Sequence, residues 1–266
     1  MNEEFQQDDQ ITRVVEPEII KMGMFQRLSS IFVSPGELMQ NIKTYPIISV
    51  PLIASIIIGL ISVPIMQQVA EMLNQQLSII SIERFGVDLL DIGGVDEYGD
   101  AAVTAVMDAV MIVGFAVSAL LGPLIAGAIY AVSFWIMCKI AKGTATLAQL
   151  FSMSLHIYVL YIIGSIIASS LMVLTGNFLD MTSLAAVVMP GGNISMIEFN
   201  ILSSVSIFTV WTAVLYYIGV KTLNDFSNFK AGVIAFIAFA ANTAVLTGSM
   251  MLPIIMWDRL MAAGVF

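Results

Sequence analysis

The sequence predicts an all-α membrane protein, a bundle of five transmembrane helices preceded by an N-terminal interfacial amphipathic helix. Hydrophobic residues make up 59% of the 266-residue chain and charged residues only 11%, whereas an average soluble domain has about 25% charged residues. The apolar residues gather in runs of roughly 20 or more, the length that crosses a bilayer. The basic residues gather beside alternate ends of these runs, which gives the bundle an orientation.

Residues 1–18 are polar and acidic, with Arg13 as the one basic residue. We predict a disordered, acidic cytoplasmic tail here, because the stretch has too few apolar residues to bury. It lacks the basic start and apolar core of a signal peptide, so the first span itself is expected to direct insertion.

Residues 19–45 are predicted to form amphipathic helices on the cytoplasmic side. The apolar positions of the first helix fall near one face; they are Ile20, Met24, Phe25, Leu28 and Ile31. Lys21, Gln26 and Arg27 are among its polar positions. Such a helix lies in the membrane interface or packs against the protein's own cytoplasmic side, and both arrangements stay open. Ser34, Pro35 and Glu37 predict a capping box that starts a second helix.

The membrane domain is predicted over residues 46–256, followed by a short outer tail at 257–266. The expected spans are about 47–66, 110–138, 152–175, 201–223 and 231–256. The second span belongs to an apolar stretch, 101–140, that contains Gly122 and Pro123, which predicts one long, kinked helix. The acidic loop before it lacks the spacing of an EF-hand, so we expect a solvated loop rather than a calcium site.

Lysine and arginine predict the orientation, because cytoplasmic loops carry an excess of both. They precede the first span and flank the loops near 140 and 225, while the other side holds only Arg84 and Arg259. The N-terminus is therefore expected inside and the C-terminus outside. In a bacterial cell this membrane would be the cytoplasmic membrane.

Composition also limits the function. A pI near 4.4 disfavours nucleic-acid binding, and one cysteine (Cys138) and one histidine (His156) leave no material for a metal site or most catalytic triads. The sequence has no phosphate loop, no HExxH and no GxSxG. We expect no enzyme activity, cofactor or metal; His156 with Asp225 is the one pairing that a lipid-acting enzyme could use.

Three segments resemble the Yip membrane-protein family, which is named for its interaction with Ypt/Rab GTPases. They are Phe32-Val33-Ser34-Pro35-Gly36-Glu37 with Ile42, Pro46 and Pro51-Leu52; Lys142-Gly143-Thr144-Ala145-Thr146 with Gln149-Leu150-Phe151; and Trp211 to Lys221 with Phe226 to Ala231. The resemblance runs from about Met24 to Pro253 and implies five spans and no enzyme activity. Length and loops look more like bacterial members, some of which are thought to assist ABC-type exporters or envelope-stress resistance.

The leading hypothesis is a multi-pass scaffold or accessory protein that binds other membrane proteins, including an ABC-type exporter complex, or shapes the lipid bilayer. Its candidate interaction face is Phe25, Leu28, Phe32, Pro35, Lys43, Lys142 and Lys230. The alternative is a transporter or channel whose polar cavity among the middle spans is lined by Ser133, His156, Tyr158 and Asn242. Small residues such as Gly114, Ser118 and Gly122 recur at helical spacing and favour close helix packing, within the chain or in a homo-oligomer.

Overall fold

The computed structural model of the chain describes residues 20–85, 97–176, 180–188 and 196–262. The predicted tail at 1–18 and most of the acidic loop before residue 97 lie outside these residues. Within the described part the fold is entirely helical, with a single isolated bridge between Ser183 and Ser206.

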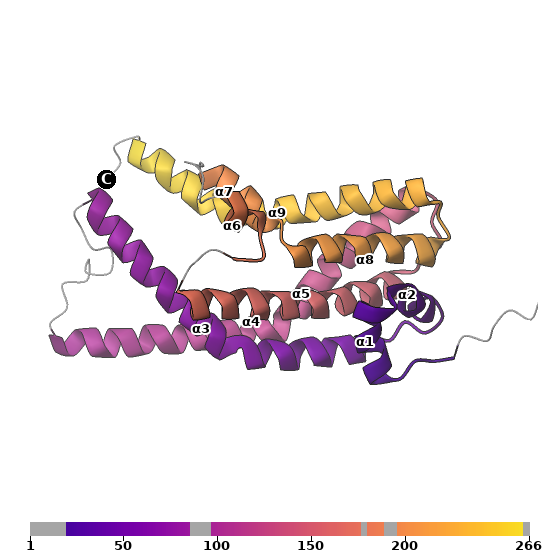
Figure 1. Cartoon of the computed structure of the whole chain (residues 1–266), viewed down its shortest axis with the longest axis horizontal. Helices are drawn as coiled ribbons and strands as arrows, with labels where there is room; N and C mark the ends of the chain where they lie inside the picture. Colours follow the sequence, from indigo (N-terminus) through magenta and orange to yellow (C-terminus); the bar gives the residue numbers. More distant parts are fainter. Residues whose placement is uncertain (1–19, 86–96, 177–179, 189–195, 263–266) are drawn as a thin grey trace, which may run out of the picture.

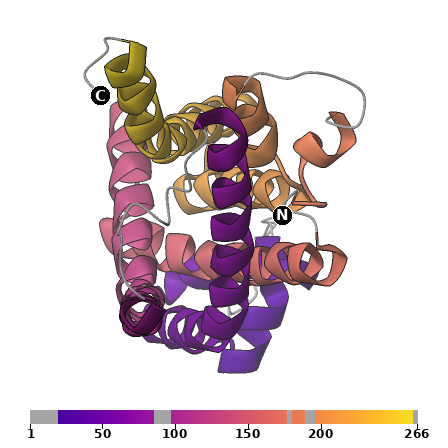
Figure 2. The same cartoon turned by 90° about the vertical axis from the view of Figure 1, so that its left-hand side faces the viewer.

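The helices follow one another in chain order and differ greatly in length. They are α1 (Met24–Val33), α2 (Pro35–Thr44), α3 (Ser49–Phe85), α4 (Glu97–Ile140), α5 (Leu147–Thr175), α6 (Leu184–Val188), α7 (Met196–Ser204), α8 (Ile207–Asn224) and α9 (Asn228–Ala262). The long helices lie side by side, with α1 and α2 at the end where α4 turns into α5 and α8 turns into α9 (Figure 1). At the opposite end α3, α4 and α9 diverge (Figures 1 and 2).

Four of the described helices are long and apolar enough to cross a membrane. The qualifying stretches are Ser49–Met72, Asp108–Ile140, Leu147–Thr175 and Asn228–Val245. The second and third of these stretches contain the expected second and third spans, and the first and last overlap the expected first and fifth spans. The helices are longer than those spans because hydropathy marks only the apolar part of a helix: α3 continues to Phe85 and α9 to Ala262.

The apolar stretch predicted as one long, kinked helix forms the single helix α4, with Pro123 inside it. Figure 1 shows that both α3 and α4 change direction along their length, and α3 also contains an interior proline, Pro64. A proline removes one backbone hydrogen bond and clashes with the preceding turn, which is the usual cause of such a bend.

The helix at the expected fourth span begins later than predicted. We expected it to start at residue 201, but α7 ends at Ser204 and α8 starts at Ile207, whose N–H donates to Thr182 O (3.1 Å). The hydroxyl of Ser206 caps α8 by accepting from Thr209 N (3.2 Å). The break is set by the contact with the 180–183 segment, which hydropathy does not detect.

The core between α4, α8 and α9 is built from aromatic rings. Tyr216 of α8 stacks on Phe134 (4.6 Å between ring centroids) and on Tyr130 (5.2 Å) of α4. Phe239 of α9 lies 6.0 Å from Tyr216. Such offset pairs add to the stability that buried area provides. They hold α8 to two helices that qualify as membrane-crossing.

Candidate functional site: the basic end of the bundle

Every lysine of the chain lies at one end of the bundle, which we call the basic end. It consists of α1 with the residues just before it, α2, the last turns of α4 and α8, the first turn of α9, and the turns at 141–146 and 225–227 that join these helices. The predicted interaction face lies here, on elements far apart in sequence. Its geometry depends on how α1 and α2 are attached to the two turns.

Helix α1 is attached through Arg27, which is fully buried. Its Nη2 donates to Tyr45 O (3.0 Å) and to Asn41 Oδ1, and its Nε donates to Met22 O (3.4 Å). Asn41 Nδ2 in turn donates to Ile20 O (2.8 Å). Because burial disfavours the charged form, the pKa of Arg27 lies below its ordinary value.

Arg27, one of the polar positions of the amphipathic pattern, lies on the buried side of α1. It forms the buried face of α1 together with Ser30 and Ile31, whereas Phe25 is 83% exposed. An apolar pattern cannot reveal this arrangement, because the helix is docked by hydrogen bonds from a guanidinium to α2 rather than by apolar contacts alone.

The capping box predicted for the start of α2 is not formed. Ser34 occupies the N-cap position, but its side chain caps nothing and donates instead to Ser30 Oγ (3.2 Å). The described capping box lies at α5, where Gln149 N donates to Thr146 Oγ1 (3.3 Å) and Thr146 N donates to Gln149 Oε1 (2.8 Å). Both boxes have the same residue spacing, so only the backbone conformation distinguishes them.

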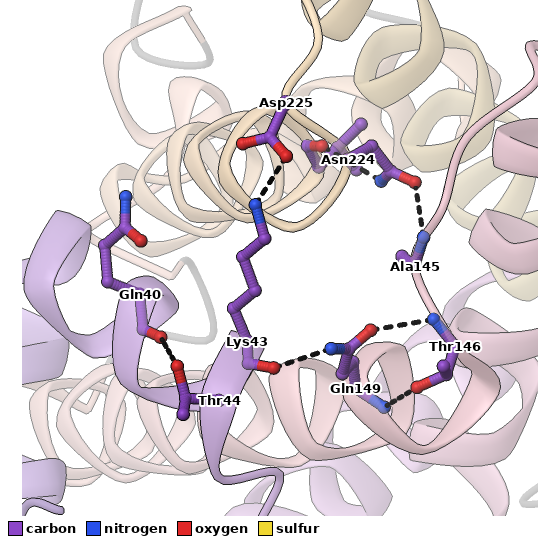
Figure 3. A network of polar contacts seen from close by, with 9 residues as sticks. Gln40, Lys43, Thr44, Ala145, Thr146, Gln149, Asn224 and Asp225 are labelled. Atoms are coloured by element: carbon purple, nitrogen blue, oxygen red, sulfur yellow. Dashed lines mark hydrogen bonds and ion pairs between the residues drawn. The ribbon is translucent and has the colours of Figure 1, made fainter. Parts of the chain in front are cut away.

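A polar network joins α2 to both turns (Figure 3). Lys43 Nζ pairs with Asp225 Oδ2 (2.5 Å), and Lys43 O accepts from Gln149 Nε2 (2.7 Å). On the far side of the network, Asn224 Oδ1 accepts from Ala145 N (2.9 Å). The network therefore fixes α2 and the two turns as one surface.

The other members of the predicted face lie on this surface with different exposure. Phe32 is exposed, Pro35 is half-buried as the first residue of α2, and Leu28 is half-buried against the core. Lys142 is exposed, with a left-handed backbone (φ 59°), and Lys230 Nζ lies 4.0 Å above the ring of Phe226. Lys142 is thus the member whose charge has no described protein partner.

The residues of the alternative, cavity-lining set have partners within the described structure. Ser133 Oγ donates to Asn242 Oδ1 (3.1 Å), and Asn242 Nδ2 donates to Ala238 O (2.8 Å), so this pair joins α4 to α9. His156 is buried, with Nδ1 2.7 Å from Ser152 O. Tyr158 stacks on Tyr161 (5.6 Å).

The pairing of His156 with Asp225 is not observed, since Asp225 pairs with Lys43 instead. Among the described residues, no group of three or more His, Cys, Asp or Glu side chains is arranged to hold a metal. Cys138 is buried and accepts a weak hydrogen bond from Asn224 Nδ2 (3.4 Å).

Long apolar helices side by side, with the lysines at one end, define a multi-pass α-helical membrane protein. The family model of the Yip1 domain matches residues 29–250, which is most of the chain. The chain belongs to the Yip1-domain family. No curated protein and no solved structure was found to match it.

Proposed function

We propose that the protein is a membrane-embedded, non-enzymatic scaffold that binds another membrane protein through the basic end. The observation that carries this proposal is α1: Arg27 anchors its buried side, and Phe25 stays 83% exposed on the other. Aromatic side chains are enriched at protein interfaces relative to the rest of the surface. The family resemblance makes an ABC-type exporter complex the first partner to test.

We also propose that α8 crosses the membrane as the fourth of five spans and that the basic end faces the cytoplasm. An 18-residue helix is about 27 Å long, close to the hydrocarbon thickness of about 30 Å. Lysines at the ends of α2, α4 and α8 support this orientation through the positive-inside rule. In a bacterial cell the N-terminus would then be cytoplasmic.

A photoreactive phenylalanine analogue at Phe25 tests the scaffold proposal in native membranes. We expect irradiation to yield a covalent adduct with another membrane protein, because this side chain projects from the anchored helix. The same analogue at Leu38, which is fully buried, is the matched control and should give no adduct with another protein. An adduct of twice the chain's mass would identify a homo-oligomer.

Adducts with lipid alone at Phe25 would overturn the protein-binding proposal. They would favour the other branch, in which α1 lies in the headgroup region and shapes the bilayer. Lysines at that depth attract anionic headgroups by about 1 kcal/mol each.

Transport is the second candidate function, and a pocket between α5, α8 and α9 favours it. Substrate sites of transporters lie between helices near the membrane midplane. Purified protein in sealed liposomes should then move a solute across the membrane, and a Gly164→Val variant, which fills the α5–α8 seam, should not. Equal leakage from protein-free liposomes would eliminate this candidate.

A further inference from the structure

A pocket of about 350 Å³ lies away from the basic end. Its walls come from α5, α8 and α9, with contributions from α4, α7 and the 180–182 segment. Its size is in the range of small-molecule sites. None of the predicted interaction or cavity residues lines it, so it is separate from the surface proposed to bind a partner.

Among the described residues that line the pocket, Asp180 is the one with a charged side chain. Its Oδ1 accepts from Thr182 N (2.8 Å) and from Thr182 Oγ1 (2.6 Å), which fix the orientation of the carboxylate. Two N–H groups at the nearby start of α8 are not available to bind an anion, because Ile207 N donates to Thr182 O and Thr209 N donates to Ser206 Oγ. The charge of the lining therefore favours a cation.

Aromatic rings contribute much of the remaining wall. Tyr130, Tyr161, Phe208 and Phe239 all line the pocket, and the rings of Tyr130 and Phe239 lie 6.5 Å apart. An ammonium group is attracted to the faces of such rings, and aromatic cages are the usual receptors for quaternary ammonium compounds.

One buried hydroxyl of the wall has no hydrogen-bond partner among the residues that the structure describes. Thr212 is 7% exposed, and its Oγ1 makes no hydrogen bond in the described structure. A buried polar group without a partner is destabilising. A ligand that carries its own hydroxyl or amine hydrogen would satisfy it.

We propose that this pocket binds a small organic cation, a primary or quaternary ammonium compound. The ammonium group lies between the Asp180 carboxylate and the aromatic rings, and a polar substituent reaches Thr212. Two sources share this chemistry: a free amine, and the headgroup of a lipid such as phosphatidylethanolamine. This site is independent of the scaffold proposal, so either can fail alone.

Choline and its uncharged isostere, 3,3-dimethylbutan-1-ol, provide the direct test. The full chain is placed in nanodiscs of phosphatidylglycerol, and binding is measured by isothermal titration calorimetry. We expect choline or ethanolamine to bind at least about tenfold more tightly than the isostere, because only the cations pair with a carboxylate. Equal affinities, or no binding of either cation in nanodiscs and in detergent, would overturn the proposal.

Two substitutions identify the site. Asp180→Asn should weaken the binding of the cation by about tenfold or more, while Asp108→Asn, which removes a carboxylate outside the pocket, should not. Thr212→Val should weaken it severalfold without lowering the melting temperature, because this hydroxyl makes no hydrogen bond within the described part of the chain. Equal effects of Asp180→Asn and Asp108→Asn would indicate only general electrostatic attraction and would contradict the assignment.

Lipid exchange distinguishes the two sources. If the headgroup is the natural ligand, nanodiscs of phosphatidylethanolamine should reduce choline binding, and native mass spectrometry should find this lipid retained by the wild type and lost from Asp180→Asn. If a free amine is the ligand, choline should bind equally in both kinds of nanodisc.

Discussion

Arg27 is the residue on which the position of α1 depends. Its fully buried guanidinium donates hydrogen bonds to Asn41 Oδ1, Tyr45 O and Met22 O. A planar fork of donors suits this geometry, and the ammonium of lysine does not. Together with the buried Ile31, this side chain holds the exposed aromatic residues of α1 in place.

We predict that Arg27→Lys releases α1 from the bundle. Buried acceptors left without a donor cost about 1–3 kcal/mol, which should appear as faster hydrogen exchange of the amides of residues 24–33. The amides of α5 should stay protected, and Lys21→Arg, on a residue with no described side-chain contact, is the control. Unchanged exchange in α1 would show that apolar packing alone is sufficient to dock it.

Asn224 and Asp225 are neighbours that differ in burial. Asn224 is buried and bonds Ala145 N (2.9 Å) and Val220 O (3.0 Å), whereas the Lys43–Asp225 pair is 32% and 74% exposed. Solvent screens exposed ion pairs, which typically contribute about 0.2–1 kcal/mol.

We predict that Asn224→Ala destabilises the protein more than Asp225→Ala does. Asn224→Ala leaves the buried N–H of Ala145 without an acceptor, which should lower the free energy of unfolding by about 1–3 kcal/mol. Asp225→Ala removes only an ion pair that solvent already screens. Thermal unfolding in detergent with and without added salt measures both. Salt should diminish the effect of Asp225→Ala, and a larger effect for Asp225 than for Asn224 would refute this ranking.

At the scale of elements, close contact between α5 and α8 depends on Gly164. A Cβ added there would lie 2.5 Å from Phe208 Cγ and 2.8 Å from Phe208 Cβ. Helices that meet through a small residue can bring their backbones together. The same contact forms part of the wall of the pocket.

We predict that Gly164→Ala lowers stability by about 1–3 kcal/mol, because a well-packed seam has no space for another methyl group. Gly114→Ala is the matched control, since nothing lies within 4 Å of its added Cβ and alanine favours a helix. Thermal unfolding should separate the two variants, and Phe208→Ala should restore part of the loss. Equal melting temperatures for both glycine variants would rule out a tight seam.

At the scale of the whole molecule, the proposed topology depends on α8. Four described helices have the length and apolarity expected of a span, and α8 is not one of them. It nevertheless connects the 180–183 segment to the basic end. With α8 across the membrane, the turn before it and the turn after it lie on opposite sides.

We predict that single cysteines at Met181 and Ser227 react with an impermeant maleimide from opposite sides of the membrane. The background is Cys138→Ala, which removes the native thiol, and Thr144 serves as a second site for the basic end. Thr144 and Ser227 should react from the cytoplasmic side. Reaction of Met181 and Ser227 from the same side would exclude α8 as a span.

Sequence alone determined the class of this protein, its long apolar helices and the gathering of its lysines, because hydropathy and charge are local properties. It did not predict the burial of Arg27, the capping box at Thr146 or the late start of α8. Tertiary structure decided these, and also the pairing of Lys43 with Asp225, 182 residues away. Hydrogen bonds and clefts depend on which distant segments meet, and the spacing of residues along one helix does not encode that.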